Sequence, residues 1–451
     1  MSNTPIYNSI KKYLNNDPVV FHMPGHKLKK KILQYDERVL DWDLTEIEGL
    51  DNLAYPSEAI LEAETLASNA FGSSHTFFSV NGSTLGIHTA IRTVCKRGDK
   101  IIVQRNSHKS VFSGINICGV NPKYIYPVID KEFGICLPIT LEQVKEAFEN
   151  NMDAVCLILT SPCYYGLCVD VKEIADYIHS IGKLLIIDEA HGSHFNFNQN
   201  LPISSVVAGA DIVVQSSHKT LPAPTQTGLI HISEKIDKEY MQFCINEIQT
   251  TSPSYILMAG IDIARDYMER EGEQRLEEVI GYVDEVKKKL RRVGYKVLEN
   301  DDKTRLVINT SNGKEVERIL MEEYNIQVEM SDQNNIVCIC TVMDDKEDLD
   351  TLYIALEEMN CVRKEKENIS YFEIPNSDRV DISDLKNIKQ VKYIESLGSV
   401  SADYIMIYPP GIPFLCPGEI ITGEHIEKIK EMIDIGVDIK GIDNQFVLVY
   451  F

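Results

Sequence analysis

The sequence predicts an α/β protein whose large domain contains a mostly parallel sheet of seven strands. From about residue 58 onward, short apolar runs alternate with longer segments whose apolar residues recur at helical spacing. Such alternation is typical of a parallel sheet, because parallel neighbours need a crossover connection between them. Polar residues directly follow several of the runs, at the edge of the sheet where ligands bind. The predicted strands are residues 76–80, 100–103, 123–126, 154–159, 184–187, 212–215 and 228–232.

The bulk composition favours a globular chain of two or three domains, because 451 residues exceed one ordinary core. The formal net charge of −23 argues against nucleic acid as a partner, since phosphates call for a basic surface. It is compatible with a small cationic substrate, although acidic composition often serves solubility alone. No stretch approaches the ~20 apolar residues of a membrane span. Residues 1–5 lack the start of a secretory signal.

The eleven cysteines indicate a reducing compartment. Most lie inside apolar runs, and no Cys-x-x-Cys pair occurs. We expect Cys338 and Cys340 to share one face of a single strand rather than to bind metal. The sequence therefore predicts free core thiols, no metal site and a cytoplasmic protein.

The chain is expected to divide into four parts. Helices are predicted before and after these strands, at residues 60–71, 255–268, 276–290, 314–324 and 348–359. The first of them is ended by Gly72. The charge run at residues 364–368 is interpreted as a solvated linker. The parts are an N-terminal segment, a large domain, a small α/β domain and a C-terminal domain, at 1–57, 58–295, 296–363 and 364–451.

Two polar runs at predicted strand ends suggest the chemistry. Residues 216–220, which include Lys219, follow the strand that ends at residue 215, and residues 188–192 follow the strand at 184–187. An amine at one strand end and a carboxylate at another match the needs of pyridoxal phosphate. Lys219 would form the Schiff base, and Asp188 would keep the pyridine nitrogen protonated.

Other strand ends offer groups for the same cofactor. Ser83 and Thr84 lie where a strand meets a helix, and helix N-terminal amides with hydroxyl side chains bind phosphate. Ser216 and His218 add donors to the same crevice. His108 follows another strand, and its flat imidazole is a candidate to stack on the pyridine ring.

Together these motifs resemble the Orn/Lys/Arg decarboxylases, which are fold-type-I enzymes dependent on pyridoxal phosphate. The resemblance spans nearly the whole chain and has the compact form, without an N-terminal wing domain. Each motif is weak alone, and the set is specific. It comprises residues 24–27, 45–51, 81–84, 106–110, 188–192, 217–222, 251–255, 408–413 and 417–419.

The resemblance implies an aspartate-aminotransferase-like large domain and a site at a subunit interface. It implies Lys219 as the Schiff-base lysine, Asp188 as the pyridine partner and His108 stacked on the ring. The phosphate would lie among Ser83, Thr84, Ser216 and His218. Family members assemble at least as dimers, and we expect a homodimer or a larger homo-oligomer.

The implied reaction is decarboxylation of a basic L-amino acid, with arginine favoured and lysine or ornithine as alternatives. Lys219 or His191 would return a proton to the α-carbon. An aminotransferase or another lyase on the same fold is a second hypothesis, in which Arg105 could hold the substrate α-carboxylate. A third is a silent regulatory protein. Glu419 is interpreted as an acid at a helix start, or as part of a pocket for the substrate's distal cation.

Overall fold

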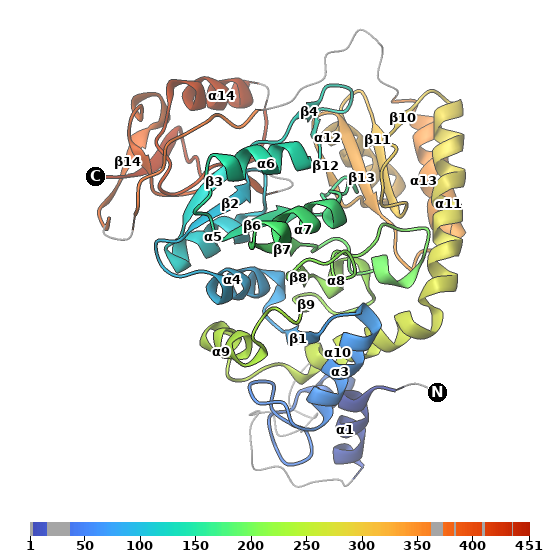
Figure 1. Cartoon of the computed structure of the whole chain (residues 1–451). Helices are drawn as coiled ribbons and strands as arrows, with labels where there is room; N and C mark the ends of the chain where they lie inside the picture. Colours follow the sequence, from blue (N-terminus) through green and yellow to red (C-terminus); the bar gives the residue numbers. More distant parts are fainter. Residues whose placement is uncertain (1–2, 16–36, 362–372, 383–384, 408–410, 435) are drawn as a thin grey trace. The chain divides into compact units, whose positions relative to one another are not determined.

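The computed structural model describes residues 3–15, 37–361, 373–382, 385–407, 411–434 and 436–451 (Figure 1). The chain forms two compact units, each built from segments that are not consecutive in the sequence. The four parts predicted from the sequence are consecutive segments, so these two units do not test them, and that division stays a prediction. The first unit comprises Met1–Val94, Asp170–Gly281 and Cys340–Asp344, and the second comprises Cys95–Val169, Tyr282–Ile339 and Asp345–Phe451.

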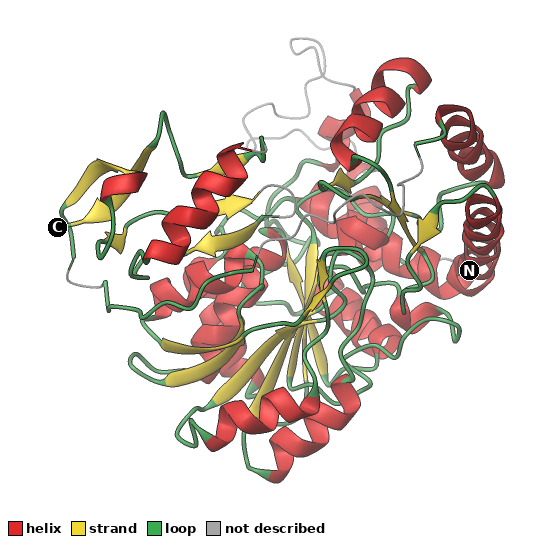
Figure 2. Cartoon of the chain, turned by 90° about the horizontal axis from the view of Figure 1, so that it is seen from above, coloured by secondary structure: helices red, strands yellow, loops and turns green. Residues whose placement is uncertain are grey.

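The main sheet has seven strands in the order β1-β9-β8-β7-β6-β2-β3. Figure 2 shows strands of this sheet side by side. β2 pairs in parallel with β3 and β6, and β7 with β8, whereas β9 runs antiparallel to β1 and β8. The prediction of a mostly parallel seven-stranded sheet is therefore confirmed. Its strands are β1 (His75–Ser79), β2 (Lys100–Gln104), β3 (Asn121–Ile125), β6 (Cys156–Thr160), β7 (Leu184–Asp188), β8 (Ile212–Gln215) and β9 (Gly228–Ile232).

Helices of the first unit cover its part of the sheet. α4 (Gly82–Val94) packs against β1, β8 and β9, and α9 (Lys238–Ile248) packs on α4. α3 (Ala59–Phe71) packs beside β1 and ends at Gly72, whose φ of 74° suits a residue without a Cβ. The others are α1 (Pro5–Leu14), α2 (Glu37–Trp42), α7 (Val171–Ser180), α8 (Ser217–Thr220) and α10 (Tyr255–Tyr267), with the 3₁₀-helix Phe195–Phe197.

A long helix, α11 (Glu273–Arg292), follows α10 after a π-helical turn at Met268–Gly272. The second unit contains α5 (Lys109–Cys118), α6 (Leu141–Glu149), α12 (Gly313–Tyr324) and α13 (Lys346–Met359). Its four-stranded sheet has the order β10-β11-β13-β12. These strands are β10 (Lys296–Val297), β11 (Arg305–Asn309), β12 (Met330–Ser331) and β13 (Asn335–Ile339), and a short hairpin joins β4 (Ile129–Asp130) to β5 (Ile135–Cys136).

The C-terminal part of the second unit has its own hydrophobic core. Phe414, Ile429, Met432 and Val447 belong to one buried cluster there. Two three-stranded sheets, one helix and a 3₁₀-turn surround it. They are β14 (Ile388–Lys392), β15 (Val400–Ser401), β16 (Ile405–Ile407), β17 (Ile412–Leu415), β18 (Ile439–Lys440), β19 (Phe446–Tyr450), α14 (Gly423–Asp434) and Tyr393–Glu395.

Some local expectations need correction. β13 ends at Ile339, so Cys340 lies beyond the strand and does not share a strand face with Cys338. The motif at residues 24–27, the linker at 364–368 and residues 408–410 lie outside the described residues. Among the helices that the structure describes, none is long and apolar enough to cross a membrane.

Candidate active site

The first unit brings Lys219 next to a histidine from a neighbouring strand end. Lys219 lies on α8, a single turn that begins directly after β8. His191 follows β7 and is only 3% exposed. Lys219 Nζ lies 2.9 Å from His191 Nε2. Since β7 and β8 are parallel neighbours, their carboxyl ends deliver the amine and the imidazole to the same edge of the sheet.

Asp188 is the last residue of β7 and is 3% exposed. Its Oδ1 accepts a hydrogen bond from the backbone N–H of Ala190 at 3.2 Å. Asp188 therefore stands three residues from His191 in the same strand-end loop. This is a carboxylate held by the backbone at the edge of the sheet, as a partner for a pyridine nitrogen requires.

The next residue, Glu189, is the centre of a buried polar network that the sequence did not reveal. Its Oε1 accepts from the backbone N–H and the hydroxyl of Ser205, at 2.7 and 2.6 Å. Its Oε2 accepts from Ser204 Oγ at 3.1 Å and from Gln215 Nε2 at 2.6 Å. Burial raises the pKa of Glu189 to about 7, although these donors pull it down.

The network continues across the sheet as a chain of four side chains, which we call the polar rail: Thr76, His231, Gln215 and Glu189. Thr76 Oγ1 lies 2.8 Å from His231 Nδ1, and His231 Nε2 lies 3.1 Å from Gln215 Oε1. Because Gln215 offers its carbonyl oxygen, His231 must carry its proton on Nε2. Burial lowers the pKa of His231 to about 3, so the ring is neutral. The rail ends at Glu189, the residue that follows Asp188.

The start of α4 meets the end of β8 at two hydroxyl groups. Ser216 Oγ donates to Ser83 Oγ at 2.9 Å, and Gly82 adopts a φ of 70° as the chain turns into the helix. A Cβ on Gly228 would lie 3.2 Å from the backbone N of Ser83 and 3.0 Å from the Gln215 carbonyl. Glycine at residue 228 therefore lets β9 pass close to the helix N-terminus.

The donors around this turn fit a phosphate. The first amides of α4 have no intrahelical acceptor, and the helix dipole favours an anion there. Ser217 Oγ is buried and receives no hydrogen bond among the described residues. Thr84 is exposed in the first turn of α4. His218 Nδ1 donates to the Thr227 carbonyl at 2.8 Å, and this contact fixes the orientation of the ring.

His108 belongs to the second unit, where it caps α5. Its Nδ1 accepts from the backbone N–H of Ser110 at 3.2 Å and lies 2.9 Å from Ser110 Oγ. These contacts fix the plane of a half-buried ring at the end of β2. A fixed flat ring suits stacking, and that role stays a prediction.

Arg105 is fully buried, and its guanidinium is committed to the C-terminal part of the second unit. Nη1 donates to the Pro413 carbonyl at 2.7 Å, and Nη2 donates to the Phe414 carbonyl at 3.1 Å. Nη2 also lies 2.9 Å from Glu419 Oε2. The suggestion that Arg105 clamps a substrate carboxylate is therefore wrong, because this contact set occupies the group.

The structure corrects one of the two interpretations of Glu419. α14 begins at Gly423, so Glu419 does not start a helix. Its side chain is 1% exposed, and Oε2 accepts from the backbone N–H of Cys416 at 2.8 Å besides pairing with Arg105. Oε2 is thus committed to Arg105 and Cys416, whereas Oε1 is buried and has no hydrogen bond among the described residues. A role of Glu419 in organising a pocket for the substrate's distal cation stays a prediction.

Comparisons with known proteins decide the family. The sequence model described as "Orn/Lys/Arg decarboxylase, major domain" matches residues 4–310, more than half of the chain. The chain belongs to the Orn/Lys/Arg decarboxylase family. The C-terminal domain of the same family matches residues 379–439. The resemblance inferred from the motifs is thus confirmed.

Relatives within this decarboxylase family are similar over different lengths. The chain is 37% identical to the arginine decarboxylase of Bacillus subtilis (strain 168) over an alignment of 466 positions. The alignment covers 97% of this chain and 95% of that protein. It is 26% identical to the lysine decarboxylase LdcA of Pseudomonas aeruginosa, over 59% of this chain and 40% of that protein.

Solved structures share the decarboxylase fold. The lysine decarboxylase of Francisella novicida has a TM-score of 0.82 at 20% identity, covering 99% of this chain and 81% of that one. The alanine–glyoxylate aminotransferase of Nostoc sp. has a TM-score of 0.57 at 16% identity, covering 75% and 99%. A further solved structure, described as "SPT with PLP", has a TM-score of 0.55 at 13% identity, covering 66% and 75%. The aminotransferase-like fold is therefore confirmed.

Proposed function

We propose that this chain decarboxylates L-arginine to agmatine and CO₂ with the help of pyridoxal phosphate. The observation that carries the proposal is the 2.9 Å approach of Lys219 Nζ to His191 Nε2 in the loop system that also holds Asp188. Arginine is preferred because a relative that matches 97% of the chain at 37% identity is an arginine decarboxylase.

The residues of the first unit fit the cofactor. Lys219 would hold it covalently, and Asp188 would bind its ring nitrogen. Its phosphate would lie at the start of α4, where Ser83, Thr84, Ser216 and His218 provide hydroxyl and imidazole groups besides the helix amides. When bound, the cofactor supplies an electron sink for the pair of electrons left on the α-carbon as CO₂ departs.

The protein's own groups would orient the substrate and move its protons. Asp188 would keep the ring nitrogen protonated, and the polar rail would hold the adjacent residue Glu189 in place. His108 would cover one face of the ring. Lys219 or His191 would return a proton to the α-carbon, and the 2.9 Å between their nitrogens would let one pass a proton to the other.

Two rival functions are less well supported. An aminotransferase would have to hold the substrate α-carboxylate, and Arg105 is not free to do so. A catalytically silent regulator has no use for a lysine and a histidine brought together at a strand end. Lysine and ornithine remain alternative substrates within the same reaction.

We further propose that the enzyme acts in the cytoplasm, in polyamine biosynthesis, as a homodimer or a larger homo-oligomer. All eleven cysteines are free thiols, which suits a reducing compartment. The segment around Ser252, which is exposed, would reach the partner's cofactor. Light scattering of the purified protein tests the assembly.

The reaction is tested by incubating the protein, supplied with pyridoxal phosphate, with equal amounts of arginine, lysine and ornithine. Mass analysis of the amines is expected to show agmatine as the main product. Cadaverine or putrescine in its place would change the substrate and keep the reaction. Keto acid without amine would contradict decarboxylation and favour the aminotransferase.

A further inference from the structure

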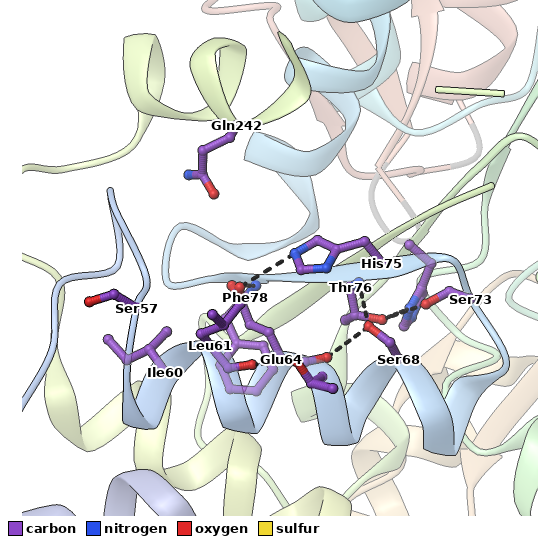
Figure 3. A network of polar contacts seen from close by, with 12 residues as sticks. Ser57, Ile60, Leu61, Glu64, Ser68, Ser73, His75, Thr76, Phe78 and Gln242 are labelled. Atoms are coloured by element: carbon purple, nitrogen blue, oxygen red, sulfur yellow. Dashed lines mark hydrogen bonds and ion pairs between the residues drawn. The ribbon is translucent and has the colours of Figure 1, made fainter. Parts of the chain in front are cut away.

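The strand at the edge of the main sheet, β1, is closed off by side chains of α3. Ser68 Oγ accepts from the Thr76 backbone N–H at 2.8 Å, and Glu64 Oε1 accepts from the Phe78 N–H at 3.1 Å (Figure 3). β1 is the first strand in the sheet order, so these amides face away from β9. One carboxylate oxygen of Glu64 thus has a structural partner.

The second oxygen of Glu64 has no hydrogen bond among the described residues. The side chain is 2% exposed, and His75 Nε2 lies 3.5 Å from Oε2, which is longer than a well-formed hydrogen bond. Burial raises the pKa of Glu64, and the nearby His75 opposes the shift. A buried carboxylate oxygen without a full partner is costly and calls for a positive group.

Glu64 and His75 line a cavity of about 600 Å³ in the first unit. Figure 3 shows the Glu64–His75 pair on the side of α3 that faces Gln242 of α9. Tyr55 and Phe243 stand at the cavity with 76% and 51% of their surfaces exposed, so two aromatic rings are available at its mouth. The other lining residues are Ala54, Pro56, Leu61, Lys238, Glu239, Asn246 and Glu247.

The charges around the cavity favour a cation. Glu239 and Glu247 line it besides Glu64, and Lys238 is the one lysine in the lining. Arg92 lies outside the lining and pairs with Glu247, Nη2 to Oε2, at 3.3 Å. With Glu247 already paired to Arg92, two carboxylates, Glu64 and Glu239, face one ammonium group and a histidine, and aromatic faces add to the attraction for an organic cation.

We propose that this cavity binds a small organic cation, with its ammonium or guanidinium group against Glu64 Oε2 and its apolar stem between Tyr55 and Phe243. None of these residues takes part in the proposed active site. A ligand that also carried a carboxylate would face Glu239 and Glu247 at the mouth. The cavity should therefore prefer a decarboxylated amine over the amino acid from which it derives, which makes it a second site for a molecule of the product class.

The choice of probe rests on the proposed function, and the measurement needs no turnover. Agmatine is titrated by calorimetry into the holoenzyme, and holoenzyme crystals are soaked in agmatine. We expect two binding events per chain, with density in the cavity in contact with Glu64. Arginine should bind the cavity at least roughly tenfold more weakly.

Glu64→Gln is the decisive variant, because it keeps an acceptor for the Phe78 amide and removes the charge. It should lose the cavity event or weaken it at least roughly tenfold. Glu62→Gln is the matched control, since Glu62 is exposed on the same helix. It should change the affinity by less than about twofold.

A second variant covers the case in which Glu64→Gln fails to fold. Gln242 is half-buried on the opposite wall, and its Nε2 donates a hydrogen bond to Asn246 Oδ1 of the same helix at 3.0 Å. Gln242→Lys would place an ammonium group in the cavity and should abolish the cavity event. Absence of agmatine density from the cavity of the wild type, or a cavity event that survives both variants, would overturn the site. Failure to decarboxylate arginine would leave this outcome unaffected.

Discussion

Lys219 and Arg105 are both cations that come just after a strand of the main sheet, and the structure uses them in opposite ways. Lys219, in the first unit, lies on a one-turn helix with its amine 2.9 Å from His191 Nε2. Arg105, in the second unit, is fully buried against two carbonyls and a carboxylate. The same position after a strand therefore brings Lys219 to a candidate ligand site, whereas it commits Arg105 to contacts within the protein. What separates them is the contact set: Arg105 is fully buried against three acceptors of its own unit, whereas the contact of Lys219 Nζ is a neighbouring imidazole nitrogen.

Replacing Lys219 gives the largest effect. We expect Lys219→Ala to lower kcat for arginine by roughly 10³-fold or more, because the covalent hold on the cofactor and a proton donor are both lost. Agmatine formation in steady-state and single-turnover assays measures this. Lys109→Ala, at an exposed lysine, is the control. Full activity of the Lys219 variant would mean that another amine does the chemistry.

Replacing Arg105 should act on stability instead. Arg105→Ala leaves Glu419 buried without its countercharge, so the free energy of unfolding should fall by about 3–5 kcal/mol. Denaturant unfolding measures the change, and Arg97→Ala, at an exposed arginine, should alter it little. A stable Arg105→Ala protein that forms keto acids in place of amine would reverse the comparison.

Glu189 tests a buried carboxylate that has only neutral donors. In Glu189→Gln the new amide would meet the Gln215 amide or the Ser205 N–H, so we expect a loss of about 1–3 kcal/mol. The pH profile adds a sign. The pKa of Glu189 is raised from 4.5 to about 7, so its contribution to stability is complete below pH 4.5 and is lost as pH rises through 7.

Unfolding curves at several pH values check this sign. The decline between pH 4.5 and 7 that belongs to Glu189 should vanish in Glu189→Gln, since the amide does not titrate. If wild type and variant kept the same slope throughout that range, another group would be responsible for it.

Ser216 should give the smallest effect. Ser216→Ala removes the hydroxyl that donates to Ser83, so we expect the affinity for pyridoxal phosphate to fall by about 1 kcal/mol, or roughly fivefold. Titration of the apoenzyme, followed by cofactor absorbance, measures it. Ser180→Ala, on the exposed side of α7, is a suitable control. An unchanged affinity would place the phosphate away from the start of α4.

The sequence was sufficient for elements that depend on local pattern. The strand at residues 212–215 was predicted with the bounds that the structure has, because its apolar run is closed by polar residues on both sides. Lys219 and His191 could be singled out for the same reason, since each follows a strand. Their mutual distance could not be foreseen, because it depends on which strands are neighbours in the sheet.

The missed features depend on partners that are remote in sequence. Arg105 meets the Pro413 carbonyl 308 positions away, and no local pattern marks it as an anchor rather than a clamp. Glu189 was visible only as the neighbour of Asp188. A signal for the rail did exist: His231 and Gln215 are polar residues in otherwise apolar strands, and buried polar groups need partners.

The polar rail has a direction. Thr76 donates to His231, His231 to Gln215 and Gln215 to Glu189, so every hydrogen bond along it points toward the acid. Bonds aligned in one sense polarise one another, and reversing one member would require the others to reverse as well. The interior of the sheet thus carries an oriented dipole that begins on the edge strand and ends beside Asp188. The hydrogen-bond chain thus connects the edge strand β1 to the loop after β7 through the interior of the sheet.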